Sequence, residues 1–310
     1  MKNYYSNGKL LLTGEYLVLD GAKSLAIATK FGQNLSVETI AEPQLIWGSF
    51  TSTGVCWFEA VFDLKNLRIV NCTFNSDKEG SAEFIAETLL AILKEAKKMN
   101  PAFLDSTQGY VVKTALSFPR NWGLGSSSTL INSIASWAQV DAFTLLWNSF
   151  KGSGYDIACA QNNAPIFYQI KDEKPSVKQV AFNPDFKENL FFVHLNKKQD
   201  SKKGIAKYRE SGKDFQKEIE RISAISDQFL QVKTIIDFNQ LIAEHEQIIS
   251  SIIKLPPVKE QLFEAYTLGE IKSLGAWGGD FILATGTAET PSYFKKKGYQ
   301  TILSYSEMVL

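Results

Sequence analysis

A six-residue loop of glycine and serine, Gly123-Leu124-Gly125-Ser126-Ser127-Ser128, stands between a strand pattern and a helix pattern. Residues 109–116 have the composition of a strand, and residues 129–140 form a mostly apolar run of helical length. Small residues let backbone N–H groups approach an anion, and the positive end of a helix dipole favours the negative charge there. The loop therefore predicts a phosphate-binding turn, with a plain serine-rich helix cap as the structural alternative.

The three consecutive hydroxyl groups add donors for phosphate oxygens and one ligand suited to Mg²⁺ beside a phosphate. The spacing disfavours other phosphate and hydrolase motifs. The chain has no GxxxxGK[ST], and the loop lacks both the third glycine of GxGxxG and the GxSxG elbow. A serine hydrolase is further disfavoured because the only imidazoles are His194, predicted in a strand, and His245, predicted on a helix surface.

Two further segments place charged side chains beside glycines. In residues 152–158, two glycines precede Asp156 in the first turn of a predicted helix, where the dipole keeps a carboxylate ionised. In residues 8–16, Lys9 and Glu15 flank an apolar strand. Taken singly, Asp156 is more typical of a helix cap than of a catalyst, and Lys9 is more typical of an exposed strand edge. These segments therefore indicate a function only when they are considered together.

In their order and spacing, the segments resemble the motifs of the GHMP kinases, named for galactokinase, homoserine kinase, mevalonate kinase and phosphomevalonate kinase. Residues 8–16, GKLLLTGEY, are similar to the first motif, residues 119–128 to the second, and residues 273–280, SLGAWGGD, to the glycine-rich third. The resemblance spans nearly the whole chain. Residues 154–158, GYDIA, and residues 272–280 look closest to the phosphomevalonate kinase branch, with mevalonate kinase next.

The resemblance implies a role for each matching residue. The phosphates of ATP would be held by the loop residues Gly123, Leu124, Gly125, Ser126, Ser127 and Ser128, with Ser127 as the Mg²⁺ ligand. Asp156 would orient or deprotonate the acceptor, and Lys9 would lie near the transferred group. Candidate substrate contacts are Glu15, Ser153, Lys272, Gly275 and Ala276, with Ser201 and Lys202 as looser matches.

Two departures from the family pattern concern the metal and the substrate pocket. Mevalonate kinases carry a metal-binding glutamate shortly before the catalytic aspartate, but residues 141–152 contain none. Trp277 interrupts the third motif where small residues are usual. Its side chain either narrows the substrate pocket or packs beneath the loop.

The length of 310 residues favours two domains over one. The first seventy residues are rich in strand signals, including residues 16–19, and residues 81–98 form the first clear helix pattern with Ser81 as N-cap. We place a boundary in the charged stretch 171–188, giving domains 1–182 and 183–310. The resemblance implies an α+β fold, with an N-terminal domain like the second domain of ribosomal protein S5, a ferredoxin-like C-terminal domain, and the active site between them.

Composition restricts the partners and the compartment. Lys plus Arg and Asp plus Glu both number 33, so the chain lacks the positive field that draws proteins to nucleic acid. No run reaches the roughly 20 apolar residues of a membrane span. Three cysteines without CxxC spacing suit a reducing compartment, so we expect a cytoplasmic enzyme. The sequence leaves the oligomeric state open, a homodimer included.

The expected function is an ATP- and Mg²⁺-dependent kinase that phosphorylates mevalonate or phosphomevalonate in the route to isoprenoid precursors. Three alternatives remain. A diphosphomevalonate decarboxylase shares the fold and the use of ATP. A non-catalytic homologue would bind a ligand without converting it. An interaction protein with its glycine and serine loops as plain caps would bind no nucleotide.

Overall fold

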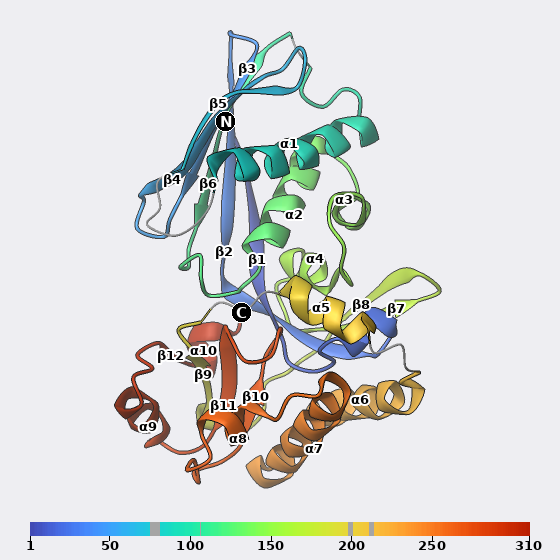
Figure 1. Cartoon of the computed structure of the whole chain (residues 1–310), viewed down its shortest axis with the longest axis vertical. Coiled ribbons are helices and arrows are strands. Elements are labelled where there is room, and N and C mark those ends of the chain that lie inside the picture. The colour runs from blue at the N-terminus through green and yellow to red at the C-terminus, as the bar shows by residue number, and fades with distance from the viewer. Residues whose placement is uncertain (75–80, 106, 198–200, 211–213) are drawn as a thin grey trace. The chain divides into compact units, whose positions relative to one another are not determined.

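The computed structural model describes residues 1–74, 81–105, 107–197, 201–210 and 214–310, and only the backbone at 201–203 and 207. The chain forms two compact units. Figure 1 shows their helices and strands, coloured by residue number. Unit 1 comprises residues 1–8, 31–120 and 125–161, and unit 2 comprises residues 9–30, 121–124 and 162–310. The polypeptide thus passes between the units several times, and a single domain boundary at residue 182 stays a prediction.

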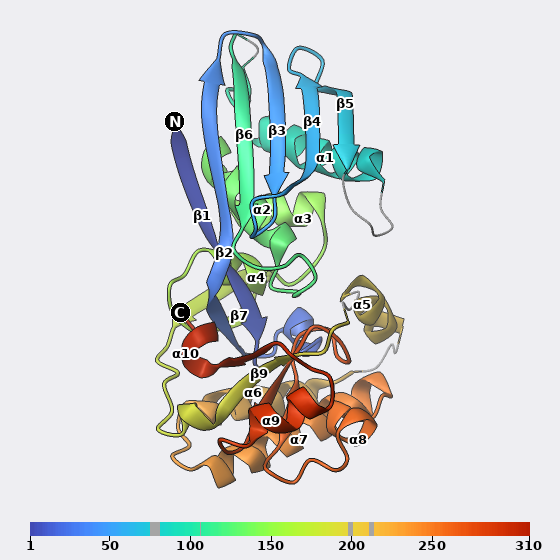
Figure 2. The same cartoon turned by 90° about the vertical axis from the view of Figure 1, so that its left-hand side faces the viewer.

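Unit 1 contains a sheet with the strand order β5-β4-β3-β6-β2, seen face on in Figure 2. The strands are β2 (Ser24–Ile40), β3 (Gln44–Phe50), β4 (Cys56–Asp63), β5 (Arg68–Phe74) and β6 (Gly109–Leu116), and β1 (Lys2–Leu11) pairs with β2. The β3/β6 pair is parallel, and β2/β6, β3/β4 and β4/β5 are antiparallel. Every second residue of β3 is buried, so one face of the sheet packs on a core.

Helices cover that face of the unit 1 sheet (Figure 1). They are α1 (Ala82–Met99), α2 (Ser126–Ala138), α3 (Ala142–Ser149) and α4 (Tyr155–Ala160). The core between them contains Trp47, Phe58 and Phe62 of the sheet, together with Leu93 of α1. The predicted cap of α1 is confirmed, because the Ser81 side chain accepts a hydrogen bond from the Phe84 amide.

Unit 2 contains a four-stranded antiparallel sheet in the order β10-β11-β9-β12. Its strands are β9 (Leu190–His194), β10 (Ile271–Ser273), β11 (Phe281–Thr285) and β12 (Ile302–Ser304). In the same unit the start of β2 pairs with β7 (Ile166–Lys171), which pairs with β8 (Lys174–Gln179).

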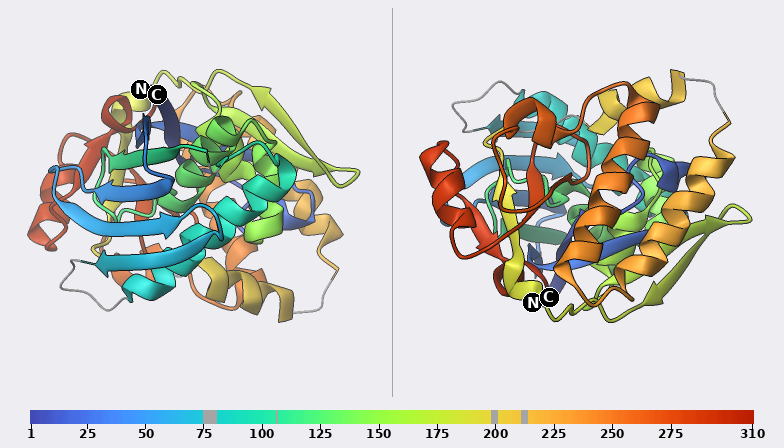
Figure 3. Two further views of the ribbon diagram at one scale, coloured as in Figure 1. Left: turned by 90° about the horizontal axis from the view of Figure 1, so that it is seen from above. Right: turned by 90° about the horizontal axis from the view of Figure 1, so that it is seen from below.

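The helical elements of unit 2 begin with η1 (Leu17–Asp20), a 3-10 helix just after β1. The others are η2 (Lys187–Asn189), α5 (Ser201–Glu210), α6 (Gln216–Phe229), α7 (Ile235–Ile253), α8 (Val258–Leu262), α9 (Thr290–Lys296) and α10 (Tyr305–Met308). Helices α6 and α7 lie side by side, as the right-hand view of Figure 3 shows. Among the described residues, no helix has both the length and the apolar character needed to cross a membrane.

The structure confirms the α+β class and corrects two local predictions. Residues 17–20 form a 3-10 helix and not a strand, because Gly14 and Tyr16 adopt positive φ values that turn the chain. The stretch 171–188 contains β8, which is joined to β7 through Asp172 and Glu173 at φ 48° and 60°. Both values are typical of a two-residue type I′ hairpin, here without the usual asparagine or glycine. The second correction is that His245, predicted on a helix surface, is fully buried.

Candidate active site

The glycine and serine loop begins helix α2, as the sequence predicts. Gly125 is the N-cap residue, with φ 89° and ψ 41°, and no side chain caps the first amides of the helix. The first turn also contains no acidic residue, so nothing on the helix opposes an approaching anion. An uncapped N-terminus of a 13-residue helix therefore has the donors and the dipole that a phosphate needs.

The three serines of this turn differ in what their hydroxyls do. Ser128 is buried and donates to the Gly125 carbonyl at 2.9 Å. Thr129 supports the same turn, because its hydroxyl lies 3.1 Å from the Gly125 carbonyl and 2.7 Å from Oε1 of Gln33. Ser127 is exposed and takes no part in these bonds. The turn is thus fixed from within by Ser128 and Thr129, which leaves Ser127 available to a ligand.

Asp156 lies in the first turn of α4, after Gly154 at φ 90°. Its Oδ1 accepts from the Ile157 amide at 3.0 Å, and its side chain is half-buried. Helix α4 packs against α2 within unit 1, and Gln161 at the end of α4 donates to Oδ1 of Asn132 in α2 at 3.0 Å. The helices that carry the serine turn and Asp156 therefore belong to the same compact unit.

Asn132 joins this pair of helices to the sheet. Its amide donates to Oγ of Ser6 at 2.9 Å, and Ser6 shares a hydrogen bond of 2.8 Å with Ser133. Asn132, Ser6 and Ser133 are all buried. A buried polar network with its members satisfied holds one arrangement, so it fixes α2 and α4 against β1.

In unit 2, the three predicted motif segments meet at Gly123. The Lys9 side chain donates to the Gly123 carbonyl at 2.9 Å, and the Lys9 amide donates to the Leu124 carbonyl at 3.0 Å. Gly123 has φ 67°, and a Cβ added there would lie 2.3 to 2.6 Å from the carboxylate atoms of Asp280. Only glycine allows this approach, so the first and third motifs fix the start of the second.

Residues 121–124 are also anchored on the C-terminal sheet. Trp122 packs edge-on against Phe281 with ring centroids 5.4 Å apart. Nε2 of His194 lies 3.1 Å from the Asn121 carbonyl. The prediction of His194 in a strand is confirmed, since it ends β9.

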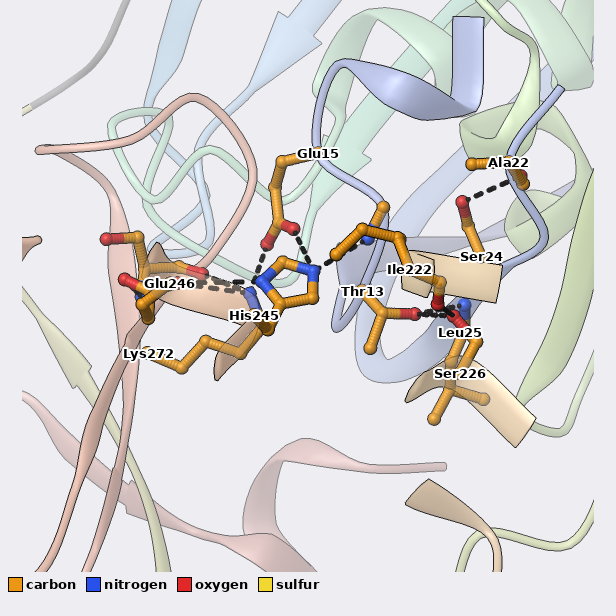
Figure 4. A network of polar contacts seen from close by, with 12 residues as sticks. Thr13, Glu15, Ala22, Ser24, Leu25, Ile222, Ser226, His245, Glu246 and Lys272 are labelled. Carbon is orange, nitrogen blue, oxygen red and sulfur yellow. Dashed lines mark hydrogen bonds and ion pairs between the residues drawn. The ribbon is translucent and has the colours of Figure 1, made fainter. Parts of the chain in front are cut away.

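A buried cluster of four ionisable side chains, here called the charged quartet, lies beside the first motif: Glu15, His245, Glu246 and Lys272 (Figure 4). None is more than 2% exposed. Lys272 Nζ lies 2.7 Å from Oε1 of Glu15 and 3.4 Å from Oε1 of Glu246. His245 Nε2 lies 3.2 Å from Oε2 of Glu15 and accepts from the Gly14 amide at 3.1 Å.

The electrostatics of the quartet favour an ionised Glu15. Burial alone raises the pKa of its carboxyl, but the neighbouring Lys272 and His245 outweigh burial and lower the pKa below its ordinary value. Burial, and to a smaller extent the same carboxylate, raises the pKa of the Tyr16 hydroxyl to about 12. Glu15 is therefore a fixed negative charge inside unit 2.

The glycine-rich third segment follows the quartet directly. It leaves β10 at Ser273 and carries positive φ values at Gly275 (65°), Trp277 (21°) and Gly278 (83°), and then at Asp280 (53°). Gly275 has open space around a would-be Cβ, so its conformation, and not crowding, calls for glycine. Ala276 and Trp277 are buried, and so is Ser153 of unit 1.

Two members of the quartet, His245 and Glu246, were not among the predicted site residues. A signal existed, because Phe238, Ile242, His245, Ile249 and Ile252 follow the 4-3-4-3 spacing of one buried helix face. A histidine at a central position of such a face calls for a buried partner. Ser201 and Lys202 lie in α5, and their side chains fall outside the described residues.

The residues of the serine turn fit a Mg²⁺ ion that is carried by phosphates. Within the described ranges, no group of three or more histidine, cysteine, aspartate and glutamate side chains could hold a metal. Mg²⁺ commonly takes one or two protein ligands and completes its shell with substrate phosphates and water. The exposed Ser127 hydroxyl next to the uncapped α2 amides suits that mode.

The two sheets, their helices and the glycine turns define the fold of GHMP small-molecule kinases, which solved structures share with this chain over nearly its whole length. The chain is similar to Methanococcus jannaschii mevalonate kinase, with 14% identity over 97% of this chain and 96% of that one and a TM-score of 0.67. It is also similar to Streptococcus pneumoniae phosphomevalonate kinase in complex with phosphomevalonate and AMPPNP, with 15% identity, 98% and 100% coverage and a TM-score of 0.67.

Lactococcus lactis galactokinase complexed with galactose is similar to the same degree, with 14% identity, 98% and 92% coverage and a TM-score of 0.66. No family model and no curated protein matches the sequence. Kinases that act on acids and a kinase that acts on a sugar are thus about equally similar to this chain in fold. The fold alone does not select the acceptor.

Proposed function

We propose that the chain is an ATP-dependent small-molecule kinase that transfers the γ-phosphoryl group to a small hydroxylated or phosphorylated acid. The observation that carries this proposal is the uncapped N-terminus of α2, with Ser127 exposed and the turn braced by Ser128 and Thr129. Phosphoryl transfer depends mainly on alignment and charge neutralisation, which is what such a turn provides.

The serine turn, Asp156 and Lys9 each take a part in this reaction. The α2 amides and Ser126 would donate to the phosphates, and Ser127 would hold Mg²⁺, which would supply positive charge to neutralise them. Asp156 orients a hydroxyl acceptor and takes its proton. If the acceptor is a phosphate, which is already ionised, Asp156 only positions it. Lys9, held by the Gly123 carbonyl, supplies a positive charge for the transferred group.

For the acceptor we propose mevalonate or phosphomevalonate, which places the enzyme in isoprenoid precursor synthesis in the cytoplasm. The support is the similarity of residues 154–158 and 272–280 to the phosphomevalonate kinase branch, together with the fold shared with kinases of both acids. Galactose remains the competing acceptor because the galactokinase shares the fold equally well.

The test is a coupled assay of ADP release with Mg·ATP over mevalonate, phosphomevalonate, homoserine and galactose, with mass spectrometry of the products. We expect ADP release that depends on one of the two mevalonate acids and a product heavier by one phosphoryl group. Release of CO₂ from diphosphomevalonate would identify a decarboxylase instead. Binding of a ligand without ADP release in the presence of any of the acceptors would contradict the kinase assignment.

A further inference from the structure

Lys272 has no N–H donor left for a substrate. An ammonium group has three donors. In this structure Nζ meets Oε1 of Glu15 at 2.7 Å, the Ser273 carbonyl at 3.0 Å and Oε1 of Glu246 at 3.4 Å. The side chain is 0% exposed. A saturated and enclosed ammonium cannot contact an acceptor without breaking its own ion pairs.

The quartet joins two segments that are far apart in sequence. Glu15 belongs to the turn that follows β1, and Lys272 belongs to β10, 257 residues later. Glu246 of α7 completes the link, because its Oε2 accepts from the Ser273 amide at 3.0 Å. The last two residues of β10 are therefore held through the lysine side chain and through the backbone.

The turn at residues 13–16 is held from a second side as well. Thr13 shares a hydrogen bond of 2.6 Å with Ser226 of α6 and accepts from the Leu25 amide at 2.8 Å (Figure 4). Gly14 has φ 90°, and a Cβ there would lie 2.0 Å from Oγ of Ser24. The turn is thus tightly packed, and it presents the Glu15 carboxylate to β10 and α7.

The loop that follows β10 needs such an anchor. Trp277 and Asp280 have positive φ values, which are unfavourable for residues other than glycine and persist only when the surroundings impose them. The far end of the loop is fixed by two backbone bonds of 2.7 Å, from the Asp280 amide to the Lys197 carbonyl and from the Leu195 amide to the Asp280 carbonyl. At the near end, the quartet grips Ser273.

We propose that Glu15 and Lys272 are positioning residues and not substrate contacts: their buried ion pair, closed by Glu246 and His245, fixes the glycine-rich loop to the first-motif turn. The loop is then the element that meets the ligand, and the quartet sets its conformation. The structural part of this proposal stands by itself, and its consequence for turnover rests on the proposed kinase function.

Hydrogen exchange of the full chain tests the positioning role directly. In Lys272→Met, two buried carboxylates lose their counter-charge, so we expect amides of residues 13–16 and 271–280 to exchange on the order of a hundredfold faster. The triple variant Glu15→Gln, Glu246→Gln, Lys272→Met leaves no unpaired carboxylate or ammonium, so its exchange should return to within about tenfold of the wild type. Peptides of unit 1 should not change.

A matched control lies two residues before Glu246. Glu244 is also on α7, but it is 40% exposed and pairs with Arg221. Glu244→Gln should leave exchange at residues 271–280 unchanged, because exposed pairs contribute little. If Lys272→Met does not fold, Glu15→Gln gives the same reading, since it removes the carboxylate that pairs with Lys272 at 2.7 Å and keeps the size of the side chain.

Turnover separates the two roles. A positioning role predicts that the triple variant regains most of the kcat and the acceptor KM that Lys272→Met loses. Unchanged exchange at residues 13–16 and 271–280 in Lys272→Met and Glu15→Gln, or an acceptor KM that stays raised in the triple variant while its exchange is normal, would overturn the proposal. If the wild type turns over no acceptor, the proposed function fails, and hydrogen exchange still decides the role of the quartet.

Discussion

Adjacent serines in the first turn of α2 should respond in opposite ways to alanine substitution. Ser128 is 3% exposed and its hydroxyl donates to the Gly125 carbonyl, so Ser128→Ala removes an internal hydrogen bond. Such a bond contributes about 1 kcal/mol to the free energy of unfolding. Ser127 is exposed and makes no capping bond, so Ser127→Ala should change that free energy by less than about 0.5 kcal/mol.

The effects on turnover should be reversed. Ser127→Ala removes the proposed Mg²⁺ ligand and should lower kcat/KM for Mg·ATP by about a hundredfold, the scale of losing one group that stabilises charge in the transition state. Ser128→Ala should lower it by no more than about tenfold, since the turn keeps the Thr129 bond to the Gly125 carbonyl.

Two assays on the same preparations check this pair of variants: denaturant unfolding without nucleotide, and ADP release as a function of Mg²⁺. The discriminating quantity is the contrast between neighbours, which cancels general effects on the helix. A Ser127→Ala protein with unchanged Mg²⁺ dependence and turnover would refute the assignment of this turn. So would a stability loss confined to Ser127→Ala.

Three other outcomes follow from the described contacts. Asp156→Asn should lower turnover by at least about a hundredfold with ATP affinity, measured by calorimetry, nearly intact. Full activity in a variant that binds ATP like the wild type would count against the assignment. Because Lys272 and His245 hold the Glu15 pKa below 4.5, its stabilisation is complete above about pH 4.5 and is lost as the pH falls through the lowered value. The free energy of unfolding should therefore depend less on acid pH in Glu15→Gln than in the wild type. The same pH dependence in both proteins would contradict this prediction. Arg120 stacks 3.6 Å from the Trp57 ring centroid, so Arg120→Ala should cost about 1 kcal/mol in unfolding free energy, and an equal loss in a Trp57→Leu background would show that the stack contributes nothing.

Periodic elements and their caps could be predicted from sequence. The strand at 109–116 matches β6, and Ser81 caps α1, because alternation and capping chemistry are local properties. The Gly125 and Gly154 turns were predictable for the same reason. A glycine just before a helix indicates a positive φ value, which both N-cap glycines adopt.

Features that depend on distant partners could not be predicted. The chain between residues 28 and 35 continues as one long strand, β2, because Gly32 lets β1 approach closely: a Cβ there would meet the Ser6 carbonyl at 2.4 Å. The charged quartet likewise draws on residues from three separate regions of the sequence. The quartet is buried only because β10, α7 and the first-motif turn pack together. The spacing of apolar residues around His245 indicated the burial of that residue alone.

The central claim is that the serine turn ahead of α2 holds the phosphates of ATP. Hydrogen exchange of the full chain with and without Mg·ATP measures this most directly, since bound phosphate protects the amides that donate to it. We predict strong protection of peptides covering residues 123–128. An unchanged exchange pattern in this segment at saturating Mg·ATP, or protection confined to other parts of the chain, would contradict the account.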